Sequence, residues 1–335
     1  MTHVQIVRIA LATGLAIMAT TFVVGGFIGT DRVTGSPTTP GTEAATTTLR
    51  FATYNVCAAN CPGLRPFTSR APKLVNQISA SGADIIGVEE LGGSRTRAIF
   101  AKAIAAKGYT YAAGAGGRSL FYKQSAVAIT DASGSRMAGT GFFMRANSNS
   151  ALRGGAYQVF RSRTTDQLFL VCDLHLSSLD SAIKDSWRLD EAKKATALLA
   201  SVKERYPSVH TILIGDFNSL THQNTSASSD SDRWRVNELL TSRGFRDSMH
   251  ATANRINYKL ASINQMPSDH RRFPTSFQLD HFYVESGVTV NRWALANRNV
   301  SYKNQYSDHD MIYMTATFPA NWPMGSAEGL GLKNG

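Results

Sequence analysis

Short runs of β-branched, aromatic and other apolar residues recur along most of this chain, and helical segments separate several of them. Runs with strand composition lie at residues 49–56, 83–91, 119–129, 157–163, 168–176, 211–217, 278–284 and 311–318. Helical patterns occupy residues 71–79 and, most clearly, residues 186–206, where apolar side chains recur at spacings of three and four. Strands and helices mixed in one stretch predict a single α/β sandwich, with two packed β-sheets flanked by helices.

The N-terminal part of the chain differs in composition from this region. An uncharged, mostly apolar run at residues 9–29 predicts a signal peptide or an N-terminal membrane anchor within residues 1–30. Residues 31–48 are rich in Thr, Pro, Gly and Ala, as in a disordered linker. We therefore expect a folded domain at residues 49–320, secreted or anchored to the outer side of the plasma membrane, followed by a flexible Gly-rich tail at residues 321–335.

Polar side chains that can bind metals or move protons stand at the ends of the apolar runs. The set consists of Asn55, Glu90, His175, Asp216, Asn218, Asp280, Asp308 and His309. A single such residue is equally well explained by a turn or a strand cap. Six separate segments that each end in a carboxylate, amide or imidazole indicate a site, because a rigid sheet can hold such groups in place at its edge.

The chemistry of these residues suits the hydrolysis of phosphate esters. Attack on phosphorus needs a cation, and the oxygen ligands of Glu90 and Asn55 suit Mg²⁺ or Mn²⁺, with Ca²⁺ as a further option. Asp216 or a His–Asp pair could act as the base for water. The groups that could donate to phosphoryl oxygens are His175, Asn218 and a protonated His309. The set contains no Cys and the chain no HExxH motif, which disfavours a thiolate nucleophile or a zincin.

The motifs TYNV, DIIGVEEL, LHL, GDFNS, LDHFYV and SDH occur in this order. Together they resemble the endonuclease/exonuclease/phosphatase superfamily, which includes deoxyribonuclease-I-like nucleases, sphingomyelinases and inositol polyphosphate 5-phosphatases. The resemblance spans Leu49 to Phe318. It implies the four-layer α/β sandwich of that superfamily, with two mixed β-sheets between helices, and metal-dependent hydrolysis of phosphate esters.

The resemblance also implies roles for the metal-facing residues. Glu90 would be the principal metal ligand, Asn55 would complete the metal shell, and Asp308 would serve a second metal position or shape the site. The residue before Glu90 is Glu89, where the family usually has Gln, so either acid could face the metal. We expect Glu89 to be solvated or paired with a lysine.

The remaining roles concern water and phosphate. Asp216 would orient or deprotonate the attacking water, and Asn218 would hold the phosphate. Asp280 would orient His309, which would act as a general base or as an imidazolium on the phosphate. His175 favours the deoxyribonuclease, sphingomyelinase and phosphatase branches over the apurinic-site endonucleases, which tend to carry Tyr there. Arg188 is open to a structural or a phosphate-steering role.

The charge of the chain favours an anionic partner. There are 35 Lys and Arg residues against 24 Asp and Glu, a formal net charge of +11. We expect a monomeric nuclease that cleaves nucleic acid, with a phospholipid or a small phosphate ester as the alternative substrate. A membrane would then be contacted only through the N-terminal segment. A non-catalytic binding module is disfavoured, because no metal or His position is missing.

Three cysteines bear on the compartment. Cys57 and Cys61 are candidates for a short-loop disulfide in an oxidising environment. Cys172 lies in the apolar run LFLVC, and we expect it to be a buried free thiol.

Overall fold

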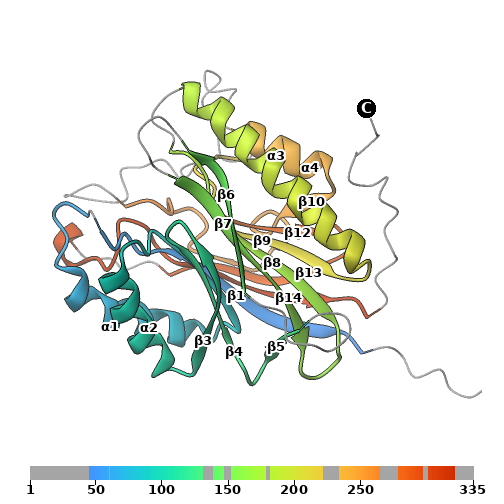
Figure 1. Ribbon diagram of the computed structural model, residues 1–335, viewed down its shortest axis with the longest axis horizontal. Coiled ribbons are helices and arrows are strands. Elements are labelled where there is room, and N and C mark those ends of the chain that lie inside the picture. The colour runs from blue at the N-terminus through green and yellow to red at the C-terminus, as the bar shows by residue number, and fades with distance from the viewer. Residues whose placement is uncertain are drawn as a thin grey trace, which may run out of the picture. The chain divides into compact units, whose positions relative to one another are not determined.

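Two β-sheets form the centre of the molecule in the computed structural model, which describes residues 45–59, 61–130, 139–146, 152–178, 182–221, 234–264, 278–296 and 301–320 (Figure 1). The first sheet has the strand order β11 (Arg255–Ile256), β13 (Thr289–Leu295), β14 (Ile312–Phe318), β1 (Thr47–Asn55), β2 (Ile85–Glu89), β4 (Arg118–Lys123) and β3 (Tyr109–Ala115). The second has the order β10 (Phe245–Asp247), β12 (Asp280–Glu285), β9 (His210–Asp216), β8 (Leu168–His175), β7 (Leu152–Ser162) and β5 (Val127–Ile129), and β6 (Thr140–Ala146) pairs with β7.

Helices cover the outer face of each sheet. On one side of the sandwich lie α1 (Phe67–Ser81) and α2 (Ser94–Ala105), and on the other α3 (Ala182–Arg205) and α4 (Arg235–Ser242), as Figure 1 shows. A short 3₁₀ helix, η3 (Tyr302–Asn304), precedes β14. This arrangement confirms the predicted four-layer α/β sandwich.

Strand alternation sorts the apolar side chains into three cores. In β9, Ile212 and Ile214 belong to the core between the sheets, whereas Leu213 belongs to the core beneath α3 and α4. In β1, Phe51 faces the other sheet and Tyr54 packs in the core with α1 and α2. Successive strand residues point to opposite faces, so a strand covered on both sides must be apolar throughout. This is why the central strands read as continuous apolar runs.

Parallel pairing gathers the polar strand ends at one edge. In the first sheet β1 runs parallel to β2, and Asn55 is in register with Glu89. In the second sheet β8 runs parallel to β9, and His175 is in register with Asp216. The antiparallel strand β12 begins opposite this point, with Asp280 beside Asp216. Strands that end at the same edge thus bring residues from distant parts of the sequence together.

Several local predictions need correction. The expected strand at residues 119–129 is two strands, β4 and β5, which belong to different sheets. β1 begins at Thr47, inside the stretch expected as linker. The sequence did not suggest β3, β6, β10, β11, β13, α2 or α4; α2, for example, buries only Phe100 and Ile104, too few apolar residues for a clear stripe. The apolar run at residues 9–29, most of the linker and the tail lie outside the described residues. No helix within the described ranges is long and apolar enough to cross a membrane.

The backbone around Gly215, just before Asp216, leaves no room for a side chain. Its φ is +134°, and a Cβ atom there would lie 2.0 Å from the carbonyl oxygen of Leu174 on β8. We expect Gly215→Ala to lower the free energy of unfolding by about 3–5 kcal/mol, since it combines an unfavourable φ with overpacking against backbone. Urea denaturation would measure this. Gly108→Ala is the matched control, because Gly108 also has a positive φ (+82°) but its Cβ would meet nothing within 4 Å. An equal loss in both variants would contradict the steric explanation.

Candidate active site

Asp216, Asp280 and His309 form a buried cluster at the edge where the strand ends meet. His309 Nδ1 lies 2.8 Å from Asp280 Oδ2, and His309 Nε2 lies 3.8 Å from Asp216 Oδ2. One potential ligand atom from each residue lies within 4.8 Å of the others. The imidazole therefore lies between two carboxylates. Asp280 is next to its Nδ1, and Asp216 is next to its Nε2.

Three further predicted residues surround Asp216. Asn55 Nδ2 donates a hydrogen bond of 3.0 Å to Asp216 Oδ2, and His175 Nε2 lies 3.5 Å from the same oxygen. Glu90 Oε1 lies 4.0 Å from His175 Nε2, and the Glu90 side chain is 40% exposed. The structure thus brings together Asn55, Glu90, His175, Asp216, Asp280 and His309. It also leaves the Glu90 carboxylate open to a ligand.

Asn218 ties the ends of two strands together. Its backbone N–H donates to Asp216 Oδ1 at 2.9 Å, and its Nδ2 donates to the carbonyl of Leu176 at 3.2 Å. Its φ is +46°, a conformation that Asn tolerates better than most residues. The carboxamide therefore anchors the segment after His175, and its role in holding the phosphate stays a prediction.

Asp308 is not part of the group formed by Asp216, Asp280 and His309, although its charge also helps to raise the pKa of His309. Its carboxylate lies within 4.8 Å of the sulfur atoms of Cys57 and Cys61, and Ser307 Oγ contacts its Oδ1 at 3.2 Å. The two sulfur atoms, which the sequence offered as candidates for a disulfide, form one and are therefore not thiolate ligands. Cys172 is buried and free, also as predicted.

The electrostatics of the cluster follow from burial and proximity. Burial alone would lower the pKa of His309, but the carboxylates of Asp280 and Asp216 raise it well above its ordinary value. Burial raises the pKa of Asp216 to about 7, against the lowering effect of His309. A positive imidazolium between two acids is thus favoured.

The donor set fits a hard divalent cation. Asp280 Oδ1 is buried and accepts no hydrogen bond from any group in the described part of the chain. Asn55 Oδ1 already accepts the backbone N–H of Cys57 at 3.1 Å. The oxygens that the site offers are therefore mainly carboxylates, from Glu90, Asp216 and Asp280, and such ligands suit Mg²⁺ or Mn²⁺.

Glu89 is not solvated or paired with a lysine, and that prediction is wrong. Its side chain is fully buried between the sheets, accepts a hydrogen bond from Thr53 Oγ1 and contacts the carboxyl of Asp173. Glu89 is the last residue of β2 and continues its inward face, whereas Glu90 lies beyond the strand with a φ of +56°. This turn of the backbone separates the two acids, and only Glu90 reaches the open site.

Burial and the neighbouring Asp173 raise the pKa of Glu89 well above its ordinary value, and burial raises the pKa of Asp173 to about 7. The folded protein thus retains a proton that the unfolded chain releases above a pH of about 4. The free energy of unfolding should therefore fall as the pH rises through 7.

We expect Glu89→Gln to remove part of this decline, because the amide donates to Asp173 without needing a proton. The variant should exceed the wild type by about 1–3 kcal/mol at pH 8, with a smaller difference at pH 5. Urea denaturation of the metal-free protein at both values would show it. Glu204→Gln, at an exposed position on α3, is the control. Parallel pH profiles for wild type and Glu89→Gln would contradict the shared proton.

Asp173 was missed at the sequence level, although a signal was present. It lies two residues before His175 on β8, and strand alternation places residues i and i+2 on the same face.

Arg188 makes several contacts with the segment that follows His175. It is buried, pairs with Asp185 and donates to the carbonyls of Ser177 and Ser178 at 3.1 and 2.7 Å. These contacts support the structural role of Arg188, because they hold the segment that follows His175 in position.

Comparisons with known proteins bear on the fold of this chain. No protein-family model and no curated protein matches the sequence. Among solved structures, an endonuclease/exonuclease/phosphatase family protein from Bacteroides thetaiotaomicron is similar with a TM-score of 0.61 and 18% identity, over 82% of this chain and 99% of that chain. A mannosyl-6-phosphatase from the same organism has a TM-score of 0.61 and 18% identity, over 81% of this chain and 100% of that one.

TDP2 from D. rerio, complexed with single strand DNA product, has a TM-score of 0.57 and 15% identity, over 81% of this chain and 99% of that chain. At these identities the similarity establishes a shared fold. The chain has the two-sheet sandwich of the endonuclease/exonuclease/phosphatase proteins, as the motifs predicted.

Proposed function

We propose that this protein is a metal-dependent phosphoric ester hydrolase of the endonuclease/exonuclease/phosphatase type. The observation that carries the proposal is the His309 imidazole held between Asp280 and Asp216. On the other side of Asp216 lies His175, which faces the partly exposed carboxylate of Glu90. Few buried structural clusters need three carboxylates, one of them open to a ligand, and two histidines at one sheet edge. Hydrolysis at phosphorus uses all of these groups.

The residues divide the work by position. Glu90, together with the acid oxygens of the cluster, would hold the divalent cation, which neutralises charge on the phosphoryl group. Asp216 orients the attacking water and accepts its proton, and Asn55 fixes the Asp216 carboxylate through a hydrogen bond of 3.0 Å. His309, kept positive by Asp280, and His175 donate hydrogen bonds to the phosphoryl oxygens.

The substrate we propose is a nucleic-acid phosphodiester. The net charge of +11 supports it, because a basic protein attracts a polyanion. The DNA product bound by TDP2 of the same fold adds support. A small phosphate ester is the second candidate, in line with the mannosyl-6-phosphatase. For a lipid substrate there is little support in the described residues, where the exposed large apolar side chains are Tyr111 and Ile256, on strands at opposite edges of the first sheet.

We further propose that the enzyme works outside the cytoplasm. The apolar run at residues 9–29 and the disulfide between Cys57 and Cys61 support this location. Fractionation of expressing cells, with the enzyme assayed in the medium, membranes and cytoplasm, would test it. Recovery of the full-length chain in the cytoplasm with both cysteines reduced would contradict it.

Removal of the metal should abolish activity. We expect purified residues 45–335 to cleave single-stranded DNA, double-stranded DNA or RNA in Mg²⁺, to lose at least about 10²-fold in rate with EDTA, and to recover when Mg²⁺ or Mn²⁺ is added. The same preparation would be tested on p-nitrophenyl phosphate, mannose 6-phosphate and sphingomyelin vesicles. Hydrolysis of a monoester alone would replace the nuclease assignment with a phosphatase. No hydrolysis of any substrate across Mg²⁺, Mn²⁺ and Ca²⁺ would refute the proposed function.

A further inference from the structure

We propose that Arg70 is a positioning residue, which together with the Cys57–Cys61 disulfide clamps the loop after β1 and the loop before β14 into the arrangement that hydrolysis requires. The inference rests on the proposed function, since the first loop directly follows Asn55 and the second carries His309. It assigns a role to a helix residue whose guanidinium binds backbone carbonyls of both loops.

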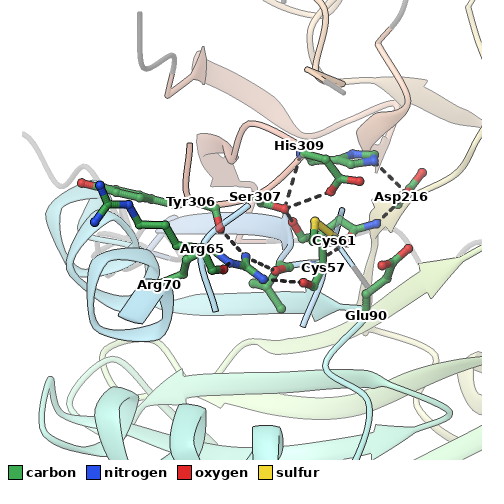
Figure 2. The surroundings of a disulfide bond; sticks show 12 residues. Cys57, Cys61, Arg65, Arg70, Glu90, Asp216, Tyr306, Ser307 and His309 are labelled. Atoms are coloured by element: carbon green, nitrogen blue, oxygen red, sulfur yellow. Dashed lines mark hydrogen bonds and ion pairs between the residues drawn. A yellow bond between two sulfur atoms is a disulfide. The ribbon is translucent and has the colours of Figure 1, made fainter. Parts of the chain in front are cut away.

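Arg70 lies on α1 and is only 3% exposed. Its guanidinium donates to the carbonyl oxygens of Val56 (3.1 Å), Cys57 (2.7 Å) and Tyr306 (2.5 Å), and its Nε donates to that of Arg65 (2.8 Å). Figure 2 shows these bonds converging on one guanidinium. Two of the acceptors follow Asn55 by one and two residues, and a third precedes His309 by three. One side chain therefore joins the two loops.

The disulfide closes the first loop on the other side. Cys57 and Cys61 are four residues apart, and Cys57 has a φ of +43°. The Cys57 N–H donates to Asn55 Oδ1 at 3.1 Å, so the position of Cys57 bears directly on the amide that holds Asp216. The cross-link limits how far this backbone can move.

The clamped segments are also bonded to each other and to Glu90. The N–H of Ala58 donates to the carbonyl of Glu90 at 3.2 Å. Ser307 Oγ donates to the carbonyl of Asn55 at 2.6 Å and accepts the N–H of His309 at 3.4 Å. A shift of the first loop would thus move the backbone supports of Glu90, Asn55 and His309 together. Figure 2 shows all of these segments meeting around the disulfide.

The planar, multi-donor guanidinium is needed for this task. Arginine presents five N–H donors in a fixed fork, whereas lysine presents one compact ammonium on a flexible chain. Lysine at position 70 would keep the charge but could not reach carbonyls on two loops at once. Displacements of about 1 Å in a catalytic group can cost about 10²-fold in rate. Arg70→Lys should therefore lower kcat about 10–100-fold with little change in KM.

The test compares Arg70→Lys with Arg246→Lys. Arg246 donates to the carbonyl of Val288 at 2.8 Å and, within the described residues, makes no hydrogen bond to either loop, so it serves as the control. For each purified protein we would measure kcat and KM with bis(p-nitrophenyl) phosphate, the thermal unfolding midpoint, and amide hydrogen exchange. In Arg70→Lys, exchange should accelerate in residues 55–58 and in residues 306–309 together. In the control, kcat and exchange in both segments should stay at the wild-type level.

A second arm removes the disulfide. We expect Cys57→Ser/Cys61→Ser, and wild type treated with a phosphine reductant that converts the bond to two thiols, to show the same loss of kcat and faster exchange at residues 55–58. When Arg70→Lys is combined with Cys57→Ser/Cys61→Ser, the fall in kcat should be smaller than the product of the two separate falls. The reason is that the arginine and the disulfide act on the same loop. This arm keeps the proposal testable if Arg70→Lys does not fold.

The outcomes separate the clamp from the catalytic assignment. Unchanged kcat in a folded Arg70→Lys protein, or faster exchange at residues 55–58 without any change at 306–309, would overturn the clamp. A KM effect with kcat intact would overturn it too, since it would place Arg70 in substrate binding. If the wild type hydrolyses nothing, the proposed function fails, and the exchange experiment still decides whether Arg70 couples the two loops.

Discussion

Replacing His309 with glutamine should lower kcat for phosphodiester hydrolysis by about 10³-fold, the largest effect we expect from a single substitution. The imidazole contacts Asp280 at 2.8 Å and faces Asp216 at 3.8 Å, and these acids keep it positive. Glutamine is of similar size and can donate a hydrogen bond, but it carries no charge to offer a phosphoryl oxygen. The substitution also leaves the buried carboxyl groups of Asp216 and Asp280 without the positive imidazolium between them.

The measurement is kcat and KM with a defined oligonucleotide at saturating Mg²⁺, near pH 7. His210→Gln is the control, because His210 is also buried but lies at the opposite end of β9 from Asp216. It should alter stability without altering kcat. If both variants lost activity equally, the effect of His309→Gln would reflect folding. If His309→Gln kept most of its kcat, the imidazole would have no chemical role.

Glu90→Gln should weaken metal binding and lower kcat/KM at about 1 mM Mg²⁺ by about 10²–10³-fold, with partial recovery as the Mg²⁺ concentration rises. The reason is that the Glu90 carboxylate is the exposed acid of the site, whereas the other acids are buried among hydrogen-bond partners. An amide keeps the shape and loses the charge that attracts a divalent cation.

Calorimetric titration with Mn²⁺ gives a readout that does not depend on activity. Glu204→Gln, an exposed acid on α3, should bind Mn²⁺ as the wild type does. Unchanged Mn²⁺ affinity in Glu90→Gln would exclude Glu90 as the principal ligand. Attention would then move to Asp216 and Asp280.

The sequence predicted the central strands and the residues at their ends well. β9 ends at Asp216 and β8 at His175, as the apolar runs indicated, because strands covered on both faces must be apolar until they leave the sheet. Short edge elements such as β10 and β11 were missed, since two or three residues produce no detectable period. The split of residues 119–129 between two sheets depends on partners that local sequence does not reveal.

The amino-acid sequence by itself determined the fold class, the order of the polar strand ends and the chemical class of site that they suit. These features are local: each depends on periodicity within one run and on the residue types that follow it. The tertiary structure decided which acid faces the site. Glu89 and Glu90 are neighbours in sequence, and only the positive φ of Glu90 and the burial of Glu89 against Thr53 and Asp173 separate their roles.

The tertiary structure also placed Asp308 beside the disulfide and joined two distant loops through Arg70. Contacts of this kind link residues far apart in the sequence: Arg70 and Tyr306 are 236 positions apart. Their geometry depends on how two sheets and a helix pack, and no single segment of the chain carries that information.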